Sequence, residues 1–103
     1  MTFCLKSSII KPEKNIDIKN AVVLLHGYGG SGEDISMLSL SWKRHMPNTI
    51  FICPDAHEPC SINTSGYQWF DLTKDNSEYI LEQSLKAEKK LNKFLEEVKN
   101  EYK

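Results

Sequence analysis

A glycine-rich segment that follows an apolar run is the part of this sequence best suited to chemistry. The run Ala21 to Leu25 leads directly into residues 26–32, which read His-Gly-Tyr-Gly-Gly-Ser-Gly. Glycine lets the backbone turn tightly and approach a ligand closely, so a turn of this composition can present backbone N–H groups. Such N–H groups bind either a phosphate or the oxyanion that develops during acyl transfer.

The spacing of the glycines leaves these two chemistries open. Gly27, Gly29 and Gly32 satisfy the nucleotide-binding pattern Gly-x-Gly-x-x-Gly. That pattern also needs an acidic residue about 20 residues further on, at the end of the next strand, whereas Asp55 follows Pro54 at a greater distance. We therefore favour an oxyanion turn, in which a backbone N–H after His-Gly faces the reacting carbonyl. A purely structural turn is the third alternative.

Apolar runs and helical spacing predict the elements that position this turn. Residues 2–10 predict a first strand, and residues 21–25 predict a strand buried on both faces. Residues 49–53 predict a further strand, which ends at Pro54. A helix starting near Glu33 and ending near residue 45 separates the last two strands. Strand, helix and strand in this order indicate an α/β fold with a mostly parallel sheet and flanking helices.

The second half of the chain predicts a long loop and a long helix. Residues 55–77 contain many turn-forming residues and an aromatic patch, and they predict an irregular loop. From Glu78 onward, apolar residues recur at steps of three and four, which predicts an amphipathic helix packed on the sheet. The apolar positions are Ile80, Leu81, Leu85, Ala87, Leu91, Phe94, Leu95, Val98 and Tyr102.

Composition limits the fold and the partners. The chain has 103 residues with 13 basic and 14 acidic side chains, which suits one domain, residues 1–103, and predicts no nucleic-acid partner. No apolar run approaches the roughly 20 residues of a membrane span, and the N-terminus does not resemble a secretory signal, so we expect a cytoplasmic protein. Three cysteines predict reduced thiols. Cys53, Asp55, His57 and Cys60 lack paired ligand spacing, so we expect no metal site.

Three blocks of the sequence resemble the phospholipase/carboxylesterase and acyl-protein thioesterase family. These blocks are residues 23–34, residues 51–60 and residues 67–72, and the third contains Gln-Trp-Phe-Asp-Leu. The resemblance implies a piece of an α/β-hydrolase that cleaves carboxylic esters or thioesters with a serine nucleophile and without metal or organic cofactor. It also implies that the backbone N–H of Tyr28 is an oxyanion donor, and that Trp69 and Phe70 border the acyl pocket. The remaining residues of the implied oxyanion loop are His26, Gly27, Gly29 and Gly30.

The catalytic triad of such an enzyme is absent from the sequence. Ser31 breaks the Gly-x-Ser-x-Gly nucleophile motif at its last position, and no other serine satisfies it. In the family, the nucleophile, the aspartate and the histidine would all lie beyond Lys103. We assign His26 to the turn, His45 to a helix end and His57 to the loop, rather than to catalysis. The sequence thus predicts a partial α/β-hydrolase domain, lacking the C-terminal strands and inactive alone.

The missing strands also predict an open sheet edge. In the α/β-hydrolase order, the nucleophile strand lies beside residues 21–25, so its absence would expose that strand. Three hypotheses follow: a shortened hydrolase, a non-enzymatic module that binds a partner through this edge and keeps the pocket of Trp69 and Phe70, or one half of a split hydrolase. In each case the edge could be covered by a complementing C-terminal chain or by a second copy of this chain.

Overall fold

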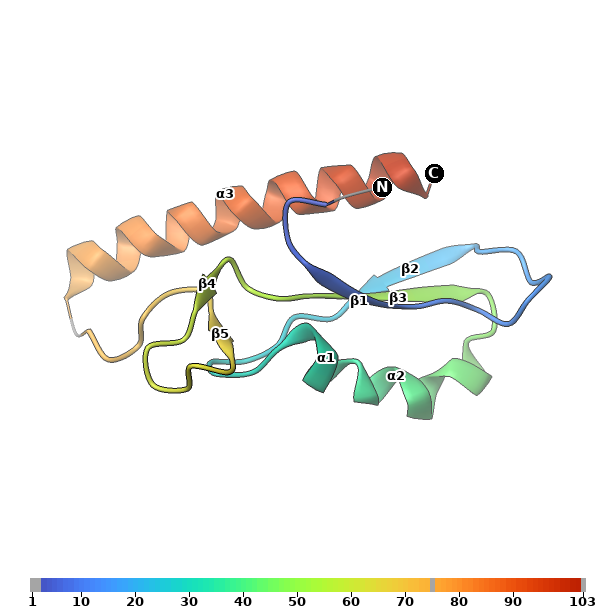
Figure 1. Cartoon of the computed structure of the whole chain (residues 1–103). Helices are drawn as coiled ribbons and strands as arrows, with labels where there is room; N and C mark the ends of the chain where they lie inside the picture. The colour runs from blue at the N-terminus through green and yellow to red at the C-terminus, as the bar shows by residue number, and fades with distance from the viewer. Residues whose placement is uncertain (1–2, 75, 103) are drawn as a thin grey trace.

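The computed structural model describes residues 3–74 and 76–102, which form three layers. A long helix, α3, lies on one face of a three-stranded sheet, and the short helices α1 and α2 lie on the other face (Figure 1). The elements in chain order are β1 (Ser7–Ile10), β2 (Asn20–Val23), α1 (Gly32–Ile35), α2 (Met37–Trp42), the 3-10 turn η1 (Lys43–His45), β3 (Thr49–Pro54), β4 (Glu58–Pro59), β5 (Tyr67–Gln68) and α3 (Ser77–Glu101).

The sheet has the order β1-β3-β2, with β3 in the centre. β3 runs antiparallel to β1 and parallel to β2, so β2, the two short helices and β3 form the predicted βαβ unit. All six residues of β3 are buried, whereas Asn20 and Ala21 are exposed and Val22 and Val23 are half-buried. The prediction that residues 21–25 are buried on both faces is therefore wrong, since Ala21 and Leu25 are exposed and residues 22–24 are half-buried. Among the described strands, β2 pairs only with β3 and forms an edge. The expected open edge is confirmed.

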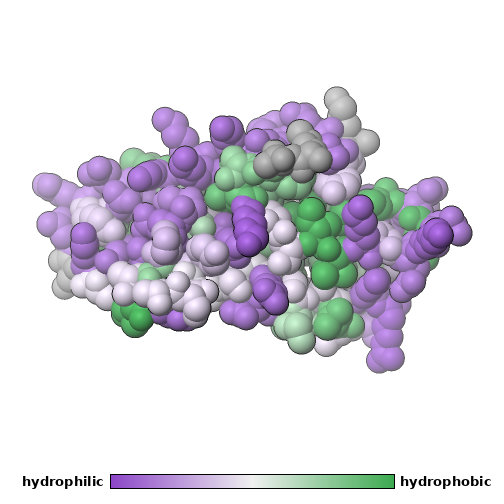
Figure 2. All heavy atoms as spheres, viewed as in Figure 1, coloured by the Kyte–Doolittle hydropathy of each residue, from purple (hydrophilic) through white to green (hydrophobic). Residues whose placement is uncertain are grey.

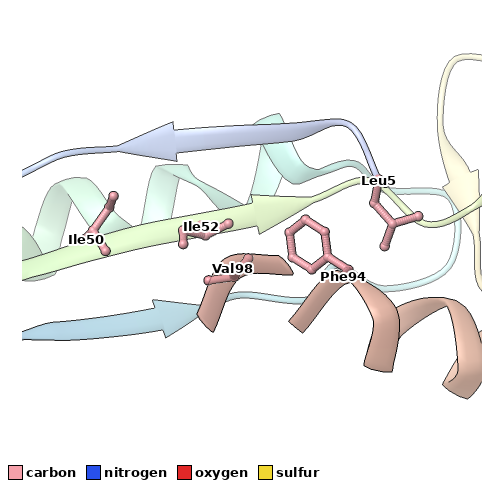
Figure 3. Packing of buried hydrophobic residues seen from close by; sticks show 5 residues of the cluster. All are labelled: Leu5, Ile50, Ile52, Phe94 and Val98. Carbon is pink, nitrogen blue, oxygen red and sulfur yellow. The ribbon is translucent and has the colours of Figure 1, made fainter. Parts of the chain in front are cut away.

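The hydrophobic core lies between the sheet and α3. Phe94 and Val98 of α3 pack on Ile50 and Ile52 of β3 and on Leu5 from the segment before β1 (Figure 3). The ring of Phe3 meets that of Phe94 edge to face, with centroids 5.4 Å apart. These contacts hold α3 across the sheet and fix the loops at one end of it.

Helix α3 packs on the sheet only through its C-terminal half. The side chain of Asn76 caps the helix by accepting hydrogen bonds from the amides of Glu78 and Tyr79, so α3 begins one residue before the predicted start. Its buried residues are Ala87, Phe94 and Val98. A helix of 25 residues is about 38 Å long, roughly twice the length of β3, so its first turns extend beyond the sheet. The predicted packing of the whole apolar stripe is therefore wrong for those turns.

The region predicted as one helix from residue 33 to 45 is divided. Ser31 caps α1 by accepting a hydrogen bond from the Asp34 amide at 3.1 Å. The α-helix is interrupted at Ser36, although the backbone of Ser36 keeps right-handed helical angles, and it gives way to a 3-10 turn after Trp42. The side of this region that faces the protein interior carries Ser36 and Ser39, which are both buried. The exposed side of α2 is apolar and consists of Met37, Leu38, Leu40 and Trp42. Figure 2 shows some of these apolar atoms at the lower edge of the molecule, over α2.

Two further predictions need correction. The first strand begins at Ser7 rather than near residue 2, which lies outside the described residues. The segment 55–77 is not wholly irregular, because β4 and β5 pair antiparallel, with Glu58 opposite Gln68. This pairing folds the segment back towards the glycine-rich turn. None of the helices in the described part of the chain has the length and apolar character needed to cross a membrane.

Candidate functional site

The glycine-rich turn after β2 is held in place by the segment that contains β5. The amide of Gly29 donates to the carbonyl of Tyr67 at 3.0 Å, and the amide of Tyr67 donates to the carbonyl of Gly30 at 2.8 Å. The side-chain amide of Asn63 donates to the Gly29 carbonyl at 2.9 Å. Gly29 has φ of 80°, a conformation that glycine adopts without steric cost. The two segments therefore form one unit, although more than 30 residues separate them in the sequence.

Two glycines permit close backbone contact within this unit. A Cβ atom on Gly66 would overlap the carbonyl group of Gly29, and a Cβ atom on Gly32 would overlap the carbonyl group of Cys53. The amide of Gly32 also donates to the carboxylate of Asp55 at 2.8 Å, which ties the start of α1 to the end of β3. The turn is thus held at Gly29 and at Gly32 by close backbone contacts that leave no room for a Cβ atom on Gly66 or on Gly32.

The backbone N–H of Tyr28 is one of the amides of this turn, with those of His26, Gly27 and Ser31, that make no hydrogen bond within the described part of the chain. Within residues 3–74 and 76–102, no group accepts a hydrogen bond from it, whereas the amides of Gly29 and Gly30 are both used inside the protein. The phenol oxygen of Tyr28 lies 3.3 Å from both the Ser61 hydroxyl and the Asp71 carboxylate. The side chain is therefore held by Asp71 while the backbone donor stays unpaired.

Hydrogen bonds from Thr73 keep the Asp71 carboxylate, which holds the Tyr28 phenol, in its charged form. The hydroxyl and the amide of Thr73 donate to the Asp71 carboxylate at 2.6 and 2.9 Å and keep the pKa of Asp71 below its usual value. Asp71 thus remains an acceptor for the phenol of Tyr28 at neutral pH.

His26 is buried and both of its ring nitrogens are engaged. Nδ1 donates to the Gly27 carbonyl at 2.7 Å, and Nε2 accepts from the Ala56 amide at 2.9 Å. These contacts require the neutral tautomer with the proton on Nδ1. The ring stacks on Trp69 with centroids 5.5 Å apart, and Trp69 Nε1 donates to the His26 carbonyl at 3.1 Å. His26 therefore joins the turn, the end of β3 and the aromatic patch.

The residues predicted to border a pocket lie together. Tyr28, Trp69, Phe70 and Leu72 line an apolar cavity of about 200 Å³ beside the glycine-rich turn. Trp69 and Phe70 are the predicted pocket residues, and Tyr28 was predicted as a backbone donor. Leu72 was not predicted to line the pocket, although it belongs to the same Gln-Trp-Phe-Asp-Leu block. Asn63 was not predicted either, because its contact with the turn could not be inferred from its position in a polar loop.

The cysteines and acidic residues near β3 are not gathered into a group of metal ligands in the described part of the chain. Cys4, Cys53 and Cys60 are free thiols, and the described residues contain no group of three or more metal-ligating side chains. Burial acts to raise the pKa of Cys60, but the backbone amides of Asn63 and Ile62 outweigh it and the pKa lies below its ordinary value. Burial raises the pKa of Cys53.

His57 does not line the apolar cavity, and its buried surroundings disfavour the protonated form of its ring. Its side chain is 7% exposed and neither ring nitrogen has a hydrogen-bond partner among the described residues. Burial lowers the pKa of His57; the carboxylate of Glu58, 3.8 Å from Nε2, opposes this effect, and the ammonium groups of Lys86 and Lys90 add to it. Protonation of His57 is therefore disfavoured in the folded chain.

We expect the chain to lose stability in mild acid because of His57. The folded state takes up this proton less readily than the unfolded state, so its stability is greatest above the ordinary histidine pKa of about 6.5 and decreases as the pH falls below it. Thermal unfolding between about pH 8 and pH 5 measures this effect. His57→Gln should reduce the dependence, and His45→Gln, at an exposed site, should retain it. An unchanged dependence in His57→Gln would contradict the assignment.

Comparison with known proteins identifies the fold and the family. The family model for phospholipase/carboxylesterase matches residues 6–103. A solved structure, the crystal structure of esterase PE8, is 30% identical in sequence with a TM-score of 0.81, over 95% of this chain and 46% of that chain. The arrangement of sheet, helices and glycine-rich turn is thus part of an α/β-hydrolase fold. The chain belongs to the phospholipase/carboxylesterase family, and it spans about half the length of esterase PE8.

Proposed function

We propose that this chain is the N-terminal portion of a serine esterase or thioesterase domain and supplies its oxyanion loop and one wall of its acyl pocket. The observation that carries the proposal is the free backbone N–H of Tyr28, a residue that also lines the apolar cavity with Trp69 and Phe70. Membership of the phospholipase/carboxylesterase family supports an ester or thioester as the substrate. The acyl chain would lie against the aromatic rings, with its carbonyl oxygen at the Tyr28 amide.

The chemistry of acyl transfer gives each part of this site its role. Attack on the carbonyl carbon places a negative charge on the carbonyl oxygen, and a preorganised N–H donor stabilises that charge. His26, Gly27, Gly29 and Gly30 would hold the Tyr28 amide in position, since their hydrogen bonds fix the backbone on both sides of it. The reaction also needs a serine and a histidine that accepts its proton. His26 is unsuited to this task because both of its nitrogens are engaged.

The nucleophile must therefore come from outside the 103 residues, either from a continuing or from a separate polypeptide. The sequence contains no Gly-x-Ser-x-Gly motif, and Ser31 is used as the cap of α1. The open edge of β2 is where a complementing segment could add its strand. No metal or organic cofactor is required by this mechanism.

Labelling with a fluorophosphonate tests the proposal directly. The purified chain should form no covalent adduct by intact mass and should not hydrolyse a short-chain ester, because a fluorophosphonate reacts with an activated serine. A full-length serine esterase labelled in parallel serves as the positive control. A stoichiometric adduct on this chain would show that it carries its own nucleophile and would overturn the assignment of the serine to another segment.

A second candidate is a non-enzymatic binding module. The observation that favours it is that the chain has both an exposed edge at β2 and an apolar cavity. In that case the chain would bind an apolar ester or acyl group without turning it over. Titration of a non-hydrolysable ether analogue, followed by the fluorescence of Trp69 in a Trp42→Phe background, would detect such binding.

We further propose a cytoplasmic location for a single domain. All three thiols are free, which suits a reducing compartment.

A further inference from the structure

A second cavity, lined mainly by polar residues, lies on the β1 side of the sheet. Its volume is about 250 Å³, far more than the roughly 10–15 Å³ that one water molecule needs. Its walls come from the segment before β1, the segment after β3, β5 and α3, and none of its lining residues borders the apolar cavity. The residues of this polar cavity that can carry charge or donate a hydrogen bond are Cys4, Lys6, Asp55, His57, Tyr67 and Lys90.

Hydrogen bonds between these segments fix the walls of the polar cavity. The Asp55 amide donates to the Lys6 carbonyl at 2.8 Å. The Cys4 amide donates to the Glu97 carboxylate at 2.8 Å, and the Cys4 thiol donates to the Lys90 carbonyl at 3.8 Å. Figure 1 shows the segment before β1 rising from the sheet to α3. The folded chain therefore forms this cavity before any ligand binds.

The imidazole of His57 belongs to the wall of the polar cavity and has no hydrogen-bond partner. Its side chain is 7% exposed, and both ring nitrogens are unpaired among the described residues. Buried polar atoms without a partner are rare in folded proteins, because the hydrogen bond to water that they lose is not replaced. An unpaired and buried polar group in the wall of a cavity points to a polar ligand.

The charged groups around the polar cavity favour an anion as that ligand. The ammonium groups of Lys6 and Lys90 form no ion pair within residues 3–74 and 76–102. The nearby carboxylates already accept hydrogen bonds. Asp55 accepts from the Gly32 amide and Glu58 accepts from a side-chain amide of β5, each at 2.8 Å. An anion in the cavity would therefore meet two unpaired cations and carboxylates that already have donors.

We propose that the polar cavity binds a small tetrahedral anion of the phosphate type between the ammonium groups of Lys6 and Lys90 and beside the imidazole of His57. The two ammonium groups supply N–H donors and positive charge, which give charge-assisted hydrogen bonds to the anion. The cavity lies on the side of β3 opposite to the open edge of β2, so its walls do not include that edge. This inference does not depend on whether the chain takes part in ester hydrolysis.

Binding of the anion should be coupled to protonation of His57. Burial and the ammonium groups of Lys86 and Lys90 hold the pKa of His57 below its ordinary value, and the Glu58 carboxylate opposes them. An anion beside Lys90 would offset its charge and raise the pKa of His57. By reciprocity, the anion should bind more tightly as the pH falls through this pKa. The other titratable groups that line the cavity are Cys4, Lys6, Asp55 and Tyr67.

Titration of the 103-residue chain with sodium sulfate tests the proposal. Sulfate stays fully ionised in mild acid and mild base, and sodium chloride keeps the ionic strength constant. Nuclear magnetic resonance of the His57 ring protons, assigned by comparison with His57→Gln, measures both the binding and the pKa. We expect sulfate to raise the pKa of His57 and to bind about fivefold more tightly at about pH 5.5 than at about pH 8.

Two neighbouring lysines of α3 provide a matched pair of variants. Lys90→Gln removes an ammonium group from the cavity wall and should weaken sulfate binding by about tenfold. Lys89→Gln removes the same charge from an exposed residue outside this wall, so it should bind sulfate like the unchanged chain. Far-ultraviolet circular dichroism of both variants checks that weaker binding does not come from unfolding.

The outcomes separate a defined site from a general attraction to the basic residues of α3. Unchanged His57 signals up to about 20 mM sulfate would overturn the proposal. Equal weakening in Lys90→Gln and Lys89→Gln would also overturn it, because a diffuse field does not distinguish adjacent charges. A parallel titration with a phosphate monoester distinguishes a free anion from a phosphoryl group on a larger molecule, and binding of either at Lys90 supports the proposal.

Discussion

The Gly66→Ala variant should be less stable than the unchanged chain by about 1–3 kcal/mol and should lose the hydrogen bonds that hold the glycine-rich turn. The added methyl group would overlap the carbonyl group of Gly29. Neither backbone can move freely, because Asn63 and Tyr67 fix the Gly29 carbonyl and amide. Relief of the overlap therefore requires the turn to separate from the β5 segment.

Gly27→Ala is the matched control for this prediction. A Cβ atom on Gly27 would have no neighbour within 4 Å, so the same methyl group should cost much less there. Urea denaturation measures the stability of both variants, and amide hydrogen exchange at Gly29 and Tyr67 reports on the turn itself. Equal losses in the two variants would contradict the role assigned to the close contact between Gly66 and Gly29.

The second prediction concerns the amide of Tyr28 once the nucleophile is supplied. In a chain completed by a segment with the Gly-x-Ser-x-Gly motif, Tyr28→Pro should lower kcat by about 10²- to 10³-fold. Proline has no backbone N–H, so the variant removes the donor that we assign to the oxyanion. Ester hydrolysis under saturating substrate measures kcat, and the effect should be larger on kcat than on KM because the charge develops in the transition state.

Tyr28→Phe separates the amide from the side chain. Phenylalanine keeps the backbone N–H and the aromatic wall of the cavity and removes only the phenol contacts with Ser61 and Asp71. We expect this control to retain most of the activity. If Tyr28→Pro turned over substrate as fast as Tyr28→Phe, the oxyanion assignment would fail.

Local sequence patterns predicted most of the elements correctly. The run from Thr49 to Pro54 is apolar and ends at a proline, and it forms the central strand. The glycine-rich turn follows β2 as expected, and the three- and four-residue spacing after Ser77 forms α3. These features depend on short-range backbone preferences and on the periodicity of apolar residues, which a single sequence contains.

The burial of individual residues was predicted less well than the elements, because burial depends on which other elements pack against a residue. The residues of β2 have the apolar composition of a strand buried on both faces, but in the structure they are exposed or half-buried, and β3 is their only strand partner among the described residues. Leu81 and Leu85 belong to a regular apolar stripe and are exposed, since the sheet does not extend beneath them. A periodic pattern identifies the face of an element, whereas the presence of another element against that face is a property of the whole fold.

The sequence by itself determined most of the elements, the glycine-rich turn and the three blocks that resemble the phospholipase/carboxylesterase family. Only the tertiary structure decided that the amide of Tyr28 is free and beside an apolar cavity, and what holds the turn around it. Asn63, Gly66 and Tyr67 reach the turn from a segment more than 30 residues away. The physical reason is that a hydrogen bond between distant segments depends on how the chain folds back on itself, and the residue types of either segment alone do not specify that contact.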